Sequence, residues 1–207
     1  MRRIVIALSC LVVLLSACGS DKKAASPATT PVSDATTSST AGSTSSSVSI
    51  PTSTTPGCPQ AGSTDPRHTP AAQPAALLTD VAVTTSGCRD SVTFTFEKSG
   101  TAVPSCTVEY KPGPFTQDAS DKPVAVSGTA FVSVRCEPAY GYDFVTSTPT
   151  YTGPKRVTAT GTEHVTEVVE TGDFEGVLNW VIGLDEQRSF GITAGGVPTR
   201  QLTITFS

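Results

Sequence analysis

Between residues 81 and 206 the sequence alternates apolar and polar residues with a period of two, and no other feature constrains the fold as strongly. Eight short segments rich in β-branched and aromatic residues follow this pattern: VAVTT (81–85), SVTFTFE (91–97), CTVEY (106–110), AFVSVRC (130–136), RVTAT (156–160), HVTEVVE (164–170), GVLNWVI (176–182) and QLTITF (201–206). Turn sequences such as SGCRD, KPGPF and GLDEQ separate them, and only LLTD (77–80) begins like a helix. Alternate side chains of a strand point to opposite faces, so the sequence predicts an all-β domain, an antiparallel sandwich or barrel of about eight or more strands.

The segment GVLNWVIGL (176–184) is apolar on both faces. Alternation places Trp180 on one face with Leu178 and Ile182 and leaves Asn179 on the other. A strand that is apolar on both faces lies in the middle of a sheet. We therefore expect a central strand with a buried tryptophan, rather than a tryptophan that stacks on sugars.

Acidic residues flank this strand, with Asp173 and Glu175 before it and Asp185 and Glu186 after it. A strand of about ten residues at roughly 3.3 Å per residue separates the two pairs by roughly 30 Å. Glycoside hydrolysis needs two carboxylates about 5–9.5 Å apart. We therefore interpret these acids as solvated turn residues, and their spacing does not fit an EF-hand calcium loop either.

Other catalytic and metal-binding patterns are missing from the sequence. The two histidines, His68 in the low-order segment DPRHTP and His164 on the face of Thr166, are too few for a zinc amidase, and we expect His164 on a surface or edge strand. There is no G-x-S-x-G motif and no glycine-rich phosphate loop. We predict no catalytic residue, no metal site and no cofactor.

The first residues, MRRIVIALSCLVVLLSAC, are typical of an export signal. Arg2 and Arg3 precede an apolar run of 12 residues, which is too short for a helix to cross about 30 Å of hydrocarbon. The run ends in Leu15-Ser16-Ala17-Cys18, which resembles the lipobox of bacterial lipoproteins. The resemblance implies that a signal peptide of residues 1–17 is removed and that Cys18 carries the lipid. This predicts an extracytoplasmic protein anchored to the outer face of the membrane.

Residues 18–57 have the composition of a disordered tether. Between positions 29 and 55, 18 of 27 residues are Ser or Thr and none is aromatic, so the stretch cannot bury enough apolar area to fold. As a flexible coil the tether spans roughly 35 Å. Removing residues 1–17 lowers the 14 basic residues to 12 against 18 acidic ones, a net charge near −6, which argues against a nucleic-acid partner. The folded domain is expected at 58–207.

Four cysteines remain in the expected domain: Cys58, Cys88, Cys106 and Cys136. An even number in an exported domain predicts two disulfides. Three pairings are open, and we prefer Cys58–Cys88 with Cys106–Cys136. A metal site is disfavoured because no C-x-x-C motif or histidine at ligand spacing accompanies them.

The irregular segment PAYGYDFVTSTPTYTGPKR (138–156) is the candidate binding loop. It carries aromatic residues followed by two basic ones: Tyr140, Tyr142, Phe144, Tyr151, Lys155 and Arg156. Tyrosines on a loop can stack on glycan rings and hydrogen-bond through their hydroxyls. The alternative is that these side chains fasten the loop to the sandwich.

Residues 77–207 contain three characteristic runs: YKPGPFTQDASDKPVAVSGTAFVSVRCEPA, YTGPKRV and VTEVVETGDFEGVLNWVIGLDEQRSFGI. Through these runs this part of the chain resembles the AMIN-like domain of bacterial envelope lipoproteins. The arginine-led strand at 199–204 fits this resemblance, whereas Cys88 departs from it. The resemblance implies an AMIN-like β-sandwich that is not an enzyme. It also implies a domain that binds or localises to peptidoglycan or another cell-wall glycan. The alternative function is an envelope protein–protein interaction module, with an envelope protein as partner.

Overall fold

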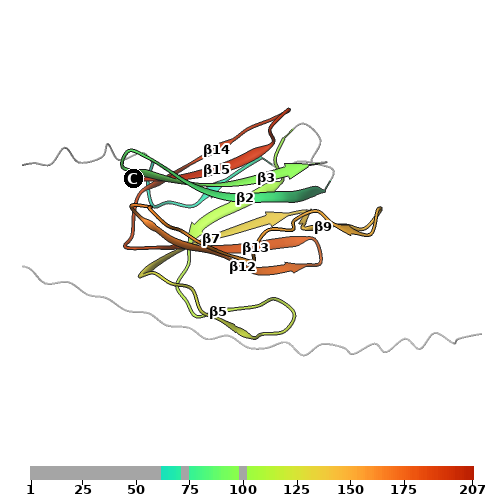
Figure 1. Ribbon diagram of the computed structural model, residues 1–207, viewed down its shortest axis with the longest axis horizontal. Coiled ribbons are helices and arrows are strands. Elements are labelled where there is room, and N and C mark those ends of the chain that lie inside the picture. The colour runs from blue at the N-terminus through green and yellow to red at the C-terminus, as the bar shows by residue number, and fades with distance from the viewer. Residues whose placement is uncertain (1–61, 71–74, 98–101) are drawn as a thin grey trace, which may run out of the picture. The chain divides into compact units, whose positions relative to one another are not determined.

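The computed structural model describes residues 62–70, 75–97 and 102–207, which form two β-sheets packed face to face (Figure 1). One sheet has six strands, in the spatial order β1 (Arg67–His68), β4 (Ser105–Tyr110), β7 (Ala130–Glu137), β13 (Val177–Leu184), β12 (Val165–Phe174) and β11 (Arg156–Thr158). The other has five, in the order β14 (Phe190–Ala194), β15 (Gln201–Phe206), β3 (Arg89–Glu97), β2 (Ala76–Ser86) and β8 (Ala139–Tyr140). Two small hairpins complete the domain: β5 (Phe115–Thr116) with β6 (Pro123–Val124), and β9 (Tyr142–Asp143) with β10 (Thr148–Pro149).

The predicted all-β sandwich is confirmed, and each of the eight segments with a period of two contains a strand of the structure. Neighbouring strands pair antiparallel, apart from the short parallel pair β2–β8. The expectation of a helical start at 77–80 is wrong, because these residues belong to β2. Leu77 pairs with Glu97 and Leu78 with Phe96, so both leucines extend the ladder with β3. In the part of the chain that the structure describes, no helix is long and apolar enough to cross a membrane.

The core lies between the two sheets and comes from the alternation of their strands. On β3 every second residue is buried, and the same holds for β15. Trp180 of β13 is 1% exposed, and its ring meets that of Phe94 on β3 edge to face at 5.9 Å. The central position of β13, between β7 and β12, is thereby confirmed, since Val181 on its other face is also buried.

Strict alternation fails at the start of β12. A register shift between Val165 and Glu167 places Val165 and Val168 in the core and leaves Glu167 on the opposite side, where it contacts Arg156. His164 precedes the strand, and its side chain is 12% exposed. His164 is thus half-buried, and the expectation that it shares a face with Thr166 and Val168 is wrong, because it precedes the strand and the β-bulge changes which side chains share a face.

One of the two preferred disulfides, Cys106–Cys136, is confirmed. Cys106 on β4 lies opposite Cys136 on β7, and the two form a disulfide. Cys88 is also disulfide-bonded. Its expected partner Cys58 lies outside the described residues, as do the predicted signal peptide, the lipid-anchor Cys18 and the tether.

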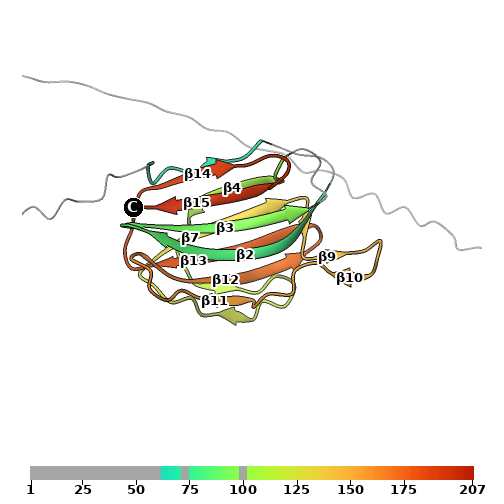
Figure 2. The same cartoon turned by 45° about the horizontal axis from the view of Figure 1, so that its top comes forward.

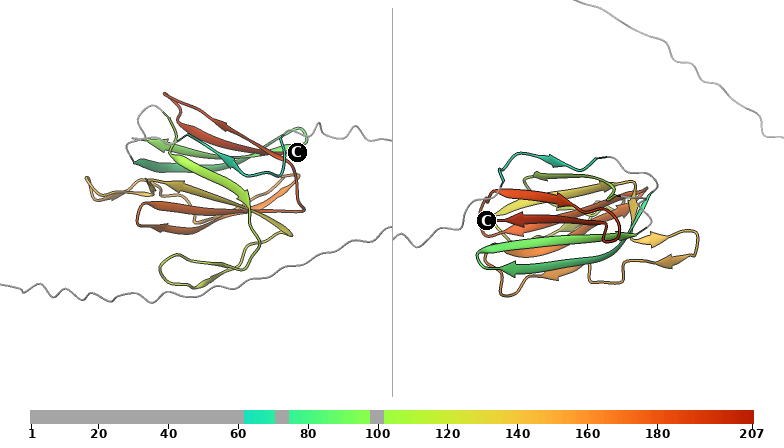
Figure 3. Two further views of the ribbon diagram at one scale, coloured as in Figure 1. Left: turned by 180° about the vertical axis from the view of Figure 1, so that it is seen from behind. Right: turned by 90° about the horizontal axis from the view of Figure 1, so that it is seen from above.

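The sandwich has two distinct ends, which the register of β15 defines. Its last residue, Phe206, pairs with Phe190 and Asp90, and Phe190 in turn bridges to Ser63, near the start of the described chain. We call this the proximal end, and it also carries the C-terminus (Figures 1 and 2). The opposite, distal end holds the β12–β13 turn, the β14–β15 turn and the β9–β10 hairpin, which extends beyond the sheets (Figure 3).

Candidate functional site

Exposed apolar side chains gather at the distal end. Among the described residues, the large hydrophobic side chains that are exposed number four: Phe144 (69%), Val145 (91%), Phe174 (49%) and Val197 (57%). Phe144 and Val145 lie between β9 and β10, Phe174 ends β12, and Val197 lies between β14 and β15. Single exposed apolar residues are ordinary, but these four all lie at the same end of the domain.

Aromatic rings pack against one another on the β9–β10 hairpin. Phe144 meets Tyr140 edge to face at 5.2 Å and Tyr142 at 5.1 Å, so the three rings support each other. They line an apolar hollow of about 260 Å³, together with Leu77 and Val145. We call Tyr140, Tyr142, Phe144 and Val145 the hairpin surface. Rigid aromatic groups of this kind lose little conformational freedom when a ligand covers them.

A second hollow, of about 230 Å³, adjoins the hairpin surface and shares Tyr142 with it. It is lined by polar groups as well, among them Asp173, Glu170, Lys155 and the ring of Tyr151. We call it the acidic cleft. Its aromatic rings and carboxylates form the combination that stacks on a sugar ring and accepts hydrogen bonds from its hydroxyls.

The charges in the acidic cleft are held in place. Asp173 accepts a hydrogen bond of 2.9 Å from the backbone N–H of Gly141, and Lys155 forms an ion pair of 2.7 Å with Glu170. Burial raises the pKa of the Asp173 carboxyl, although the Gly141 N–H and the charge of Lys155 act against this rise. Burial, reinforced by the nearby negative charges, raises the pKa of Tyr151 to about 12.

The candidate binding loop divides into three parts in the structure. Tyr140, Tyr142 and Phe144 form the hairpin surface, whereas Tyr151 packs edge to face on Trp180 at 5.5 Å and hydrogen-bonds through its hydroxyl to Pro154. Tyr151 therefore fastens the loop to the core and offers only part of its ring to the acidic cleft. Lys155 lines that cleft.

Arg156 lies apart from the hairpin surface and the acidic cleft. Its guanidinium pairs with Glu167 at 2.5 Å and donates to the backbone of Ala125 at 2.7 Å. Burial raises the pKa of Glu167, but the hydrogen bonds from Arg156 and Ser127 outweigh it, so the pKa is lowered overall. Arg156 thus fastens β11 to the segment after β6.

Sequence reasoning missed Phe174, Val145 and Val197, and it set Asp173 aside as a solvated turn residue. Glu175, its expected companion, lies in the β12–β13 turn at φ 51° and does not line the acidic cleft. The signal that could have found the exposed residues is an apolar side chain inside a turn sequence, as in D-F-E-G or D-F-V-T. Turn positions seldom reach the core, so a large apolar residue there needs another partner.

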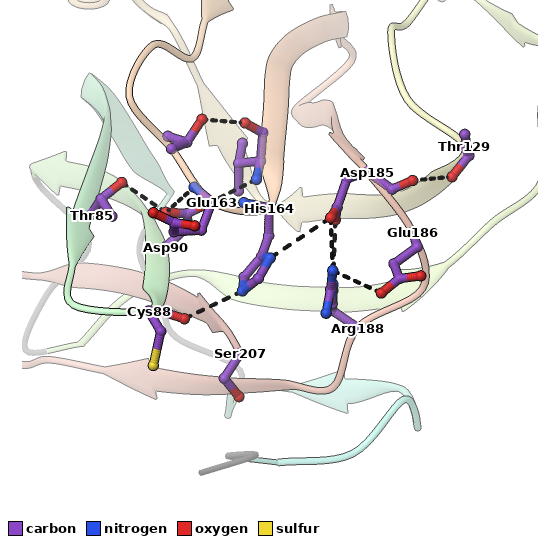
Figure 4. Close-up of polar contacts among 12 residues, drawn as sticks. Thr85, Cys88, Asp90, Thr129, Glu163, His164, Asp185, Glu186, Arg188 and Ser207 are labelled. Atoms are coloured by element: carbon purple, nitrogen blue, oxygen red, sulfur yellow. Dashed lines mark hydrogen bonds and ion pairs between the residues drawn. The ribbon is translucent and has the colours of Figure 1, made fainter. Parts of the chain in front are cut away.

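The proximal end carries a polar network instead (Figure 4). Asp90 is fully buried, and its carboxylate accepts backbone hydrogen bonds from Glu163 (3.2 Å), His164 (2.6 Å) and Val165 (2.8 Å), and one from the Thr85 hydroxyl (2.7 Å). Burial alone raises its pKa, yet these four donors together lower it. Asp90 belongs to the five-stranded sheet and its backbone partners lead into β12, so this carboxylate joins the two sheets.

His164 lies beside this network, and its ring has two polar contacts. The ring contacts the Cys88 carbonyl at 3.3 Å and the Asp185 carboxylate at 3.9 Å, and Asp185 pairs with Arg188 at 2.7 Å (Figure 4). Burial raises the pKa of Asp185, but Arg188 outweighs it and the pKa is lowered overall. Within the described ranges, neither ring nitrogen hydrogen-bonds a hydroxyl or thiol that could act as nucleophile. The same ranges contain no group of three or more His, Cys, Asp or Glu side chains placed to hold a metal ion.

The molecule is thus a two-layer β-sandwich with the polar network around Asp90 at its proximal end, and with aromatic rings and the acidic cleft at its distal end. The sequence model of the AMIN-like domain matches residues 76–204, and the chain belongs to this family. The AMIN-like domain is a cell-envelope domain that is often associated with peptidoglycan, which places this protein in the envelope, outside the cytoplasm. Comparison with curated proteins and with solved structures found no match.

Proposed function

We propose that this protein is a non-catalytic, lipid-anchored envelope protein that binds peptidoglycan through the distal end of its AMIN-like domain. One observation carries the proposal: the exposed large apolar side chains of the described chain all lie at the end opposite Ser63. In this proposal Cys18 carries the lipid, and the Ser/Thr-rich tether separates the lipid from the folded domain.

Glycan strands suit the distal end chemically. A sugar ring has apolar C–H faces, which stack on aromatic rings, and hydroxyl groups, which donate to carboxylates. The hairpin surface supplies the rings of Tyr142 and Phe144, and the acidic cleft supplies the carboxylate of Asp173 beside them. We therefore assign this arrangement to binding a ligand rather than to cleaving a bond.

Co-sedimentation with purified sacculi tests the proposal. Wild-type protein is expected in the pellet. The double variant Phe144→Ser/Phe174→Ser is expected in the supernatant, because removing aromatic anchors that a bound partner covers costs about 2 kcal/mol or more. The matched control is Gln187→Ser, which changes an exposed residue of the proximal end and should leave sedimentation unchanged. A double variant that still pellets like wild type would refute the distal site.

The same assay separates the alternative function. Wild-type protein that stays in the supernatant would refute wall binding and favour an envelope protein as the partner of the hairpin surface. The anchor has its own test in cell fractionation. Cys18→Ala should move the protein from the membrane fraction to the soluble extracytoplasmic fraction, and retention in the membrane would contradict lipidation at Cys18.

A further inference from the structure

A polar groove lies on the outer face of the six-stranded sheet, beneath the β5–β6 hairpin, which passes over that face (Figure 1). Its volume is about 270 Å³. The floor is formed by outward-facing residues of β7 and β13, among them Ser133 and Val181, which pair across the two strands. Pro114, Phe115 and Thr116 form its roof.

The hairpin is fixed over the sheet at two points, so the groove beneath it is built into the fold. At one point Phe115 packs edge to face on Phe131 of β7 at 5.3 Å. At the other, Asp118 donates its backbone N–H to Thr171 O at 2.9 Å and accepts the side-chain amide of Asn179 at 2.6 Å. The carboxylate of Asp118 lies so close to Gly172 that a Cβ there would come within 1.8 Å of it. Only glycine fits at this contact.

Two opposite charges in the groove have no partner of their own. Glu109 and Lys111, two residues apart on the outer face of β4 and just beyond its end, both line the groove. Within residues 62–70, 75–97 and 102–207, neither side chain makes a hydrogen bond or an ion pair. Arg135 lies farther along the groove and is paired with Glu137 at 2.6 Å, with both side chains about half exposed.

We propose that this groove binds a short zwitterionic peptide segment, in which a free amine and a free carboxylate lie close together. The amine pairs with Glu109, and the carboxylate pairs with Lys111, which lies on the side of Glu109 away from Arg135. A ligand with a single charge would satisfy only one of the two unpartnered groups, whereas a zwitterion satisfies both. The volume accommodates one or two amino-acid residues, with the Ser133 hydroxyl available for their backbone. The chemistry follows from the groove itself, and only cell-wall peptides as the natural source rest on the proposed function.

The chain offers a local reporter, because Asn179 is its only asparagine and lines the groove. Full-length protein in detergent micelles, labelled isotopically at asparagine alone, gives one backbone amide signal and one pair of side-chain NH2 signals. The probe is the dipeptide lysyl-alanine, and the comparison ligand is the same dipeptide with its amines acetylated and its carboxylate amidated. We expect the dipeptide at millimolar concentration to shift the Asn179 signals and the blocked form to leave them unchanged.

Two variants test the assigned roles. Glu109→Gln and Lys111→Gln are each expected to weaken dipeptide binding about tenfold, because each removes a charge-assisted contact. Glu109→Gln should also abolish the preference for the free amine, and Lys111→Gln the preference for the free carboxylate. The control Glu97→Gln changes an exposed carboxylate at the end of β3, on the other sheet, and should bind like wild type.

Three results would overturn the inference: unmoved Asn179 signals in wild type, equal shifts with the blocked dipeptide, or equal effects of Glu97→Gln and Glu109→Gln. The outcome is separate from that of the sacculus assay. If the protein fails to sediment but shows the Asn179 shift, the proposed function is refuted and peptide binding in the groove is supported. If it sediments without the shift, peptide binding in the groove is refuted and the proposed function is supported.

Discussion

Replacing Asp90 by Asn tests whether a single carboxylate holds the two sheets together at the proximal end. Oδ2 accepts from the N–H groups of His164 and Val165, and Oδ1 accepts from the Thr85 hydroxyl and the Glu163 N–H. An Asn side chain has one acceptor oxygen, so its NH2 group must face one of these two pairs of donors.

The less costly orientation turns the NH2 group towards Thr85, whose hydroxyl can rotate to accept, and leaves the N–H of Glu163 without its partner. An unsatisfied buried donor costs about 1–3 kcal/mol, and the remaining hydrogen bonds lose the assistance of the charge. We therefore expect Asp90→Asn to lower the free energy of unfolding by about 2–4 kcal/mol at neutral pH.

The effect should depend on pH. Since the folded pKa of Asp90 lies below the ordinary value of 3.8, its stabilisation is fully present above about pH 3.8 and is lost as the pH falls through the folded pKa. The difference between wild type and Asp90→Asn should therefore shrink at acidic pH.

Urea denaturation followed by the fluorescence of Trp180, the only tryptophan and 1% exposed, measures both quantities. The matched control is Asp80→Asn, an exposed aspartate of β2, for which we expect a change within about 0.5 kcal/mol. A cost of Asp90→Asn that is no larger than that of the control, or one that does not diminish with acid, would refute the role of Asp90 as the clamp between the sheets.

Three further predictions concern the core and the acidic cleft. The double variant Cys106→Ser/Cys136→Ser opens a link across a sequence separation of 30 residues and should lose about 3–4 kcal/mol in the same urea assay; an unchanged midpoint would contradict this. Gly183→Ala should cost about 1–3 kcal/mol, because its Cβ would lie 1.9 Å from a backbone carbonyl oxygen, whereas Gly191→Ala has open space and should behave like wild type. In an alkaline absorbance titration, Tyr151→Phe should diminish the component that ionises near pH 12, to which Tyr110 can also contribute because burial raises its pKa too; an unchanged component would contradict the burial of Tyr151.

The strands and much of the core could be predicted from residue patterns because both depend on local periodicity. On β3, Val92, Phe94 and Phe96 alternate with polar residues, and every one of the three is buried. The same rule failed where the structure departs from regular geometry. At the start of β12 a bulge shifts the faces, and at 77–80 the pairing with β3 outweighs a weak local helical preference.

The candidate site could be predicted only in part. Tyr140, Tyr142 and Phe144 are close in sequence, so a pattern search finds them together, and the structure brings their rings into contact. Phe174 and Val197 come from other turns, about 30 and 50 residues farther along, and nothing local links them to the hairpin surface. Their placement at the same end depends on the register of two different sheets.

The sequence by itself determined the class of fold and which strand lies at the centre, because a period of two and a segment that is apolar on both faces leave few alternatives. Only the tertiary structure decided which polar and exposed residues lie together on the domain. Strand register placed Asp90 beside the start of β12, the exposed aromatic residues at the far end, and Glu109 with Lys111 under a hairpin that two side-chain contacts hold in place. The contacts of Asp90 with Val165 and of Asp118 with Asn179 join residues 75 and 61 positions apart, and contacts over such separations follow from the packing of the whole chain rather than from any local preference of its segments.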